Sequence, residues 1–202
     1  MLSGPSRNRR RALTLMELVI SLVLFSMIVL GIANIEIFCK HAFMGTDRKT
    51  RIMNEATYIV EHMSKYIRKA IGDAQNFPVS NDPIAGITCD NITRVWIDYN
   101  ENGIRDDGDR QIVYCFNNAS HTIDYYPGFW TLPEPFTDNT AHETISRNTI
   151  ACISDFASNK GYVDINVTTC WNASIPCGTM DNPKMTLQTR ITMPSVSINA
   201  TP

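Results

Sequence analysis

Oxygen-bearing side chains recur at short, regular intervals in the stretch RVWIDYNENGIRDDGDRQIVYCF, which covers residues 94–116. Counted from its first aspartate, they match positions 1, 3, 5, 7, 9 and 12 of a calcium-binding loop, with a glycine at the sharp turn. The residues are Asp98, Asn100, Asn102, Ile104 through its carbonyl, Asp106 and Asp109, and the glycine is Gly103. Because hard oxygen ligands suit Ca²⁺, the spacing predicts a structural calcium site.

The segments on either side of this loop alternate apolar and polar residues, as strands do. The predicted site therefore lies between two strands, not between the two helices of an EF-hand, and Asp109 stands where a glutamate is usual. The competing interpretation is a polar hairpin turn, because Asp, Asn and Gly are also the commonest turn residues.

A single carboxylate, Glu17, lies near the start of a long apolar run from Leu13 to Phe38. The run has about 26 residues and would be about 39 Å long as a helix, enough to cross a hydrocarbon core of about 30 Å. Arginines at positions 7, 9, 10 and 11 precede it, which predicts a cytoplasmic N-terminus and a domain outside the membrane. An ionisable residue in such a segment is costly and is by default functional.

The sequence RRRALTLMEL around Glu17 resembles the prepilin-type cleavage and methylation motif of type IV pilins and type II secretion pseudopilins. The resemblance implies cleavage by a prepilin peptidase between Ala12 and Leu13, with methylation of the new N-terminus. Glu17 then becomes the fifth residue of the mature chain, as in the family. Ala12 and Leu13 depart from the family's usual Gly and Phe.

The resemblance also implies a role for the carboxylate. An unpaired Glu17 is costly in lipid, whereas one paired with the freed amine of a neighbouring subunit is stable and fixes the register of packing. The implied function is a filament subunit, more in keeping with a minor than a major pilin. The implied partners are a prepilin peptidase, an inner-membrane assembly platform, other pilin subunits and membrane lipid.

Two other interpretations of the N-terminus stay open. The first is an uncleaved membrane anchor that carries an extracytoplasmic, calcium-dependent binding module. The second is a secretory signal cut after Ala33, although its apolar run would be longer than the usual 7–15 residues. We expect an inner-membrane, single-pass protein whose C-terminal domain later belongs to a periplasmic or extracellular filament.

Six cysteines, five of them beyond residue 88, suit an oxidising compartment. Cys89 and Cys115 bracket the acidic loop on neighbouring predicted strands and are candidates for a disulfide. The domain has three further cysteines, so one thiol is left without a partner there; they are Cys152, Cys170 and Cys177. Cys39 lies at the predicted membrane boundary. The sequence alone does not fix the connectivity.

These sites require a long helix and a small sheet to position them. Apolar residues continue at three- and four-residue steps beyond the membrane segment, from Ile52 to Ile71, and Gly72 is a natural stop. Strand patterns follow at residues 93–98, 110–116, 121–126, 161–171 and 184–193, whereas residues 142–156 fit either a helix or a strand. We therefore expect an α+β, pilin-like fold: a leader at 1–12, a helix at 13–72 (transmembrane at about 13–38, amphipathic at 39–72) and a β-rich domain at 73–202.

Composition excludes several function classes. The 202-residue chain is 44% hydrophobic and 19% charged, which suits a packed domain. Setting aside the four N-terminal arginines leaves 14 of 18 basic residues against 20 acidic ones, so the composition does not indicate a general electrostatic affinity for nucleic acid. The sequence contains no GxSxG, P-loop, HExxH or dinucleotide motif, and we expect no enzyme.

Overall fold

The computed structural model describes residues 14–72, 77–84, 86–99, 101, 103, 105–106, 109–129, 141–156 and 161–193. The chain divides into two compact units, Met1–Met44 and Gly45–Pro202. One helix, α1 (Leu15–Ile67), supplies residues to both units, and eight strands follow it. The strands are β1 (Val79–Ser80), β2 (Asn91–Ile97), β3 (Arg110–Asn117), β4 (Thr122–Phe129), β5 (Glu143–Ser146), β6 (Thr149–Phe156), β7 (Tyr162–Cys170) and β8 (Lys184–Thr192).

The first unit contains the apolar part of α1. Its large side chains are exposed, from Leu15 at 84% to Phe43 at 75%. By length and composition α1 is able to cross a membrane, and the apolar window that qualifies it buries none of its residues within the protein. This part of the helix therefore presents an apolar surface that the described residues of the protein leave uncovered.

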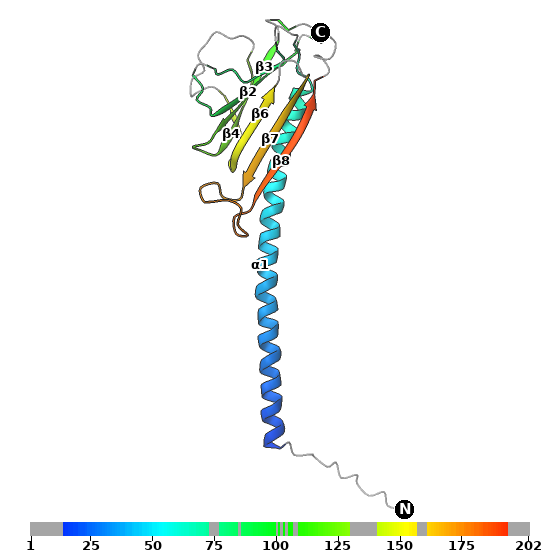
Figure 1. Ribbon diagram of the computed structural model, residues 1–202, viewed down its shortest axis with the longest axis vertical. Helices are drawn as coiled ribbons and strands as arrows, with labels where there is room; N and C mark the ends of the chain where they lie inside the picture. Colours follow the sequence, from blue (N-terminus) through cyan, green and yellow to red (C-terminus); the bar gives the residue numbers. More distant parts are fainter. Residues whose placement is uncertain are drawn as a thin grey trace, which may run out of the picture. The chain divides into compact units, whose positions relative to one another are not determined.

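The second unit has two antiparallel sheets, ordered β1-β2-β3-β4-β5 and β6-β7-β8. The predicted α+β class is confirmed, and residues 142–156, which fit either element by sequence, form β5 and β6 in different sheets. In Figure 1, β6, β7 and β8 run side by side along the cyan part of α1. The sheets are joined by a hydrogen bond between the hydroxyls of Thr93 and Ser154.

The predicted apolar stripe of α1 forms the centre of the core. Ile59, Met63 and Ile67 are fully buried and lie in one cluster with residues from the inner faces of both sheets. The sheet residues of this cluster include Val95, Ile112, Tyr114, Ile123, Val163, Ile165, Val167 and Ile191. Because one helix face covers both sheets, α1 fixes the position of one sheet with respect to the other.

Strands β2 and β3 are buried on both faces, whereas β7 alternates buried and half-buried residues. The second face of β2 and β3 is covered by the segment before β2, through a small cluster of Ile84, Ile92 and Val113. A disulfide between Cys89 and Cys115 fastens the same segment to β3.

The helix ends at Ile67, five residues before the predicted stop at Gly72. The amide of Arg68 still donates to Ser64 O at 3.1 Å, an i→i−4 bond. The following two residues tighten into i→i−3 bonds, with the amide of Lys69 donating to Tyr66 O at 2.9 Å and that of Ala70 to Ile67 O at 3.1 Å. The amide of Ile71 then donates to Trp96 O at 2.9 Å. The chain thus leaves the helix because pairing with the end of β2 replaces the helical hydrogen bonds.

Candidate processing and assembly site

The N-terminus of α1 is closed by reciprocal hydrogen bonds between Thr14 and Glu17. The backbone amide of Thr14 donates to Glu17 Oε2 at 2.9 Å, its hydroxyl donates to the same oxygen at 3.1 Å, and the amide of Glu17 donates to Thr14 Oγ1 at 3.3 Å. This pattern is a capping box, which satisfies donors that a helix N-terminus otherwise leaves unpaired. Ala12 and Leu13, the predicted cleavage residues, lie outside the described residues.

The capping box gives Glu17 a second role that the sequence analysis missed. The signal was present, because Thr at position 14 and Glu at position 17 follow the [ST]-x-x-[DE] pattern before an apolar run. The carboxylate stays at the exposed surface of the helix end. Glu17 therefore has a hydrogen-bonding partner within its own chain.

Two serines deeper in the apolar segment make hydrogen bonds within the helix. Ser21 Oγ donates to Glu17 O at 2.7 Å, and Ser26 Oγ donates to Leu22 O at 2.8 Å. Such back-bonding lets a hydroxyl lie in lipid without an unpaired donor. At the far end, Glu36 and Lys40 form an i,i+4 ion pair at 2.8 Å, which marks the return to polar surroundings.

The acidic loop between β2 and β3 is organised by two of its predicted calcium ligands. Asp98 Oδ2 accepts a hydrogen bond from the amide of Gly103 at 2.9 Å, and Gly103 has a φ of 78°. Asp109 is 4% exposed, and its carboxylate accepts bonds from the amides of Tyr99 at 3.4 Å and Asp106 at 2.9 Å. Burial and the neighbouring carboxylates raise the pKa of Asp109, against the lowering effect of these bonds.

Three of the remaining predicted ligands lie outside the described residues: Asn100, Asn102 and Ile104. Among the described residues, no group of three or more His, Cys, Asp or Glu side chains is placed to hold a metal ion. The calcium site thus stays a prediction. The loop is anchored independently by Arg105, whose guanidinium lies 3.7 Å from the ring centroid of Trp96 and donates to Phe77 O at 2.9 Å.

The cysteines of the second unit form two disulfides, Cys89–Cys115 and Cys170–Cys177. Cys152 is unpaired and buried, and burial raises the pKa of its thiol to about 12. A thiol in that state is a packing residue, not a nucleophile. Cys39, in the first unit, is exposed and unpaired.

An aromatic cluster surrounds His62 on the inner side of α1, and the sequence analysis did not single it out. The His62 ring lies within 6 Å of the ring centroids of four tyrosines, with Tyr125 nearest at 4.7 Å. The other three are Tyr58, Tyr66 and Tyr114. His62 Nδ1 lies 3.0 Å from Tyr114 Oη, so a hydrogen bond links the helix to β3.

Partial burial and the nearby ammonium of Lys65 lower the pKa of His62, and Glu143 opposes them. These surroundings therefore favour the neutral imidazole where the helix meets the first sheet.

The comparisons with known proteins bear on the N-terminus alone. Residues 7–33 match the family model described as the prokaryotic N-terminal methylation motif. Neither the curated proteins nor the solved structures give a significant match to the chain. The motif points to a structural protein that is consistent with membrane anchoring. The chain carries the prokaryotic N-terminal methylation motif at the head of a long apolar helix, and it is consistent with a type IV pilin-like protein.

Proposed function

We propose that the chain is the precursor of a minor pilin or pseudopilin in a type IV pilus or type II secretion-like filament. The observation that carries this proposal is the methylation motif at residues 7–33, which leads directly into an exposed apolar helix. The precursor spans the inner membrane once, with the unit from Gly45 onward outside. A prepilin peptidase cuts between Ala12 and Leu13, and an assembly platform brings the helix together with those of other pilin subunits.

In this account Glu17 acts through its charge, which pairs with the amine of a neighbouring subunit and sets the register. The capping box offers a different account, in which Glu17 only stabilises its own helix end. The two accounts predict different behaviour for one substitution. Glutamine at position 17 keeps the capping bond but removes the charge, since Gln also serves in a capping box.

The test is to follow the incorporation of Glu17→Gln, Glu17→Ala and Thr14→Ala chains into sheared filaments, with each precursor quantified in the membrane. We expect both Glu17 variants to lose incorporation and Thr14→Ala to keep most of it, because only the cap, worth about 0.5–2 kcal/mol, is lost. Normal incorporation of Glu17→Gln together with loss in Thr14→Ala would contradict charge pairing.

We also propose that the acidic loop binds Ca²⁺ as a structural ion. The hydrogen bond from Gly103 N to Asp98 Oδ2 supports this, because it draws the first and sixth positions of the loop together around a positive-φ glycine. The ion would order the loop, whose other end is held by Asp109. An uncleaved, membrane-anchored calcium-binding module would share this site, but it would not be processed at Ala12.

Thermal unfolding of the purified full chain in Ca²⁺, Mg²⁺ or chelator tests the site. We expect Ca²⁺ alone to raise Tm, because Mg²⁺ demands a tighter octahedral site, and we expect Asp98→Asn to abolish the increase. Glu101→Gln is the matched control, since it removes a charge from the same loop at an exposed, non-ligating position. An equal response of the two variants, or no response of the wild type, would contradict the proposal.

A further inference from the structure

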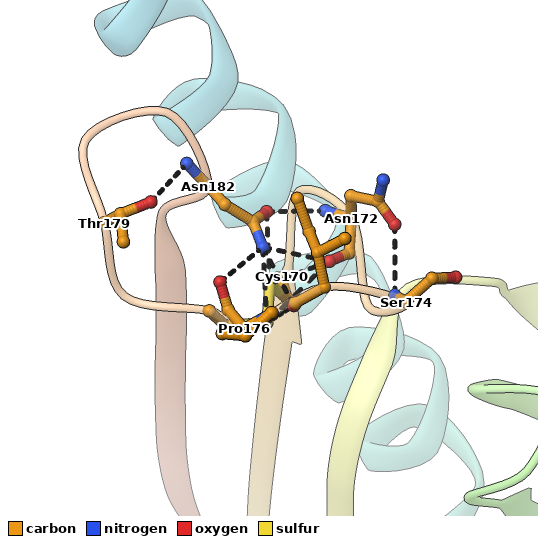
Figure 2. Close-up of a disulfide and its surroundings, with 8 residues drawn as sticks. Cys170, Asn172, Ser174, Pro176, Thr179 and Asn182 are labelled. Atoms are coloured by element: carbon orange, nitrogen blue, oxygen red, sulfur yellow. Dashed lines mark hydrogen bonds between the residues drawn. A yellow bond between two sulfur atoms is a disulfide. The ribbon is translucent and has the colours of Figure 1, made fainter.

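The loop between β7 and β8, residues 171–183, is held in one shape by its own contacts (Figure 2). The Cys170–Cys177 disulfide closes its first half. Asn182, which is 2% exposed, fills the centre: its Nδ2 donates to Asn172 O at 3.0 Å, Ile175 O at 3.1 Å and Pro176 O at 3.0 Å. The conformation is therefore fixed before any partner binds.

This rigid loop carries two large apolar side chains on its exposed surface. Ile175 is 50% exposed and Met180 is 75% exposed. Neither contributes to the core clusters of the second unit. Apolar side chains presented on a preorganised loop are typical of a contact surface, because binding there costs little ordering entropy.

The loop packs on the first residues of α1 in the second unit. Arg48 Nη1 donates to Asp181 O at 2.5 Å, and its guanidinium lies 5.8 Å from the ring centroid of Trp171. The guanidinium of Arg51 lies 5.7 Å from the same ring. Together these contacts fix the loop to the helical segment that begins at Gly45.

Gly45 directly follows the last residue of the apolar unit, so this segment leaves the membrane if the first unit spans it. The loop packs on Arg48 and Arg51, three and six residues beyond Gly45, so chain connectivity alone keeps it close to the point at which the chain leaves the membrane.

The charges of this region suit an anionic lipid surface. Lys184 approaches the loop, because a Cβ added at Gly178 would lie 3.8 Å from Lys184 Cε. Arg48 pairs with Asp181 at 3.5 Å and Arg51 with Asp47 at 3.1 Å, so Lys49 on the adjoining helix and Lys184 at the start of β8 supply the excess positive charge. Basic side chains beside a tryptophan and exposed aliphatic groups match the chemistry of a membrane interface.

We propose that the 171–183 loop rests on the outer leaflet of the membrane before assembly, with Ile175 and Met180 among the lipid headgroups and the neighbouring basic residues on anionic phosphates. This inference rests on the membrane insertion stated in the proposed function. Covalent continuity with the spanning helix supplies the high effective concentration that a small contact needs. The contact orients the outer unit on the membrane and is released when the subunit enters a filament.

The test uses the full chain in phosphatidylcholine vesicles, with or without phosphatidylglycerol, that contain lipids brominated near the headgroup. Trp171 quenching is the difference between the wild type and Trp171→Phe. We expect quenching that is stronger with phosphatidylglycerol and falls by roughly two-fold or more in Ile175→Ser/Met180→Ser. Ile153→Ser is the matched control, because Ile153 is 51% exposed on β6.

Four results would overturn the inference. Absence of Trp171 quenching in a chain that resists alkaline extraction would remove the lipid contact and leave membrane insertion intact. If Ile153→Ser reduced Trp171 quenching as much as Ile175→Ser/Met180→Ser does, the apolar residues of the loop would make no specific contribution to the lipid contact. Trp171 quenching that falls as the protein-to-lipid ratio rises would identify a second copy of the chain as the partner that covers the loop. Extraction of the chain by the alkaline wash would instead contradict insertion itself, and the lipid contact with it.

Discussion

Replacement of Asn182 should destabilise the 171–183 loop more than its position near the surface suggests. The side-chain amide supplies two hydrogens to three backbone carbonyls, and its oxygen accepts from the amide of Asn172 at 2.8 Å (Figure 2). The backbone continues the arrangement, because the amide of Gly178 donates to Asn182 O at 2.8 Å. The Asn182 side chain therefore satisfies backbone groups of the loop that regular secondary structure would satisfy elsewhere.

The magnitude follows from these bonds. Two donated hydrogens and one accepted bond, at about 0.5–1.5 kcal/mol each, give a loss of about 1.5–4.5 kcal/mol for Asn182→Ala. The lower value applies if water reaches the freed carbonyls. Asn182→Asp conserves the shape and the accepting oxygen but turns a second oxygen toward carbonyls, so it should cost at least as much as alanine.

Hydrogen exchange of the loop peptides, read by mass spectrometry beside global denaturant unfolding, measures both effects. We expect faster exchange across residues 171–183 in both variants, with Asn182→Asp at least as fast as Asn182→Ala. Asn172→Ala is the control, because the bonds at that position are made by its backbone to Asn182 and only a local side-chain bond to Ser174 N is lost. Wild-type exchange in Asn182→Asp would refute the reasoning.

Two further predictions concern the stability of the second unit. Because folding lowers the pKa of His62, the unfolded chain binds more protons than the folded chain as the pH falls through and below 6.5, and the free energy of unfolding should decrease there. Denaturant unfolding of His62→Gln should show a flatter dependence of this free energy on pH. An unchanged slope in the variant would exclude His62 as the source of the dependence. Loss of the Cys89–Cys115 disulfide, which spans 26 residues, should cost about 3.5 kcal/mol, and loss of Cys170–Cys177, which spans 7, about 2.4 kcal/mol. Denaturant unfolding under oxidising conditions of two double variants, each with serine at both cysteines of one disulfide, measures which loss in the free energy of unfolding is larger. A larger loss for Cys170–Cys177 would show that strain in the native state outweighs loop entropy.

The sequence predicts best the part of the fold in which apolar residues recur at a regular local spacing. The stripe from Ile52 to Ile67 is buried because apolar residues at helical spacing must face one side. The division of the strands into two sheets was not predicted, since the short turn at Arg147 and Asn148 carries no strong turn signal in sequence. That division depends on how α1 covers both sheets, which is a long-range property.

The sites divide in the same way. The pairing of Thr14 with Glu17 is local and was readable from a four-residue pattern. The setting of His62, by contrast, depends on Tyr114 and Tyr125, which are far away in sequence, so no local pattern in the sequence reveals it. Asn182 likewise shows its importance only when the loop is folded around it.

The most direct test of the central claim is the mass of the N-terminal peptide after co-expression of the full chain with a prepilin peptidase. We predict a mature chain that begins at Leu13 with a methylated amine, which would place Glu17 at the fifth position. A chain that still begins near Met1 would contradict processing and favour an uncleaved anchor. A chain that begins at Asn34 would contradict the filament account altogether, because cleavage there removes the apolar helix as a secretory signal.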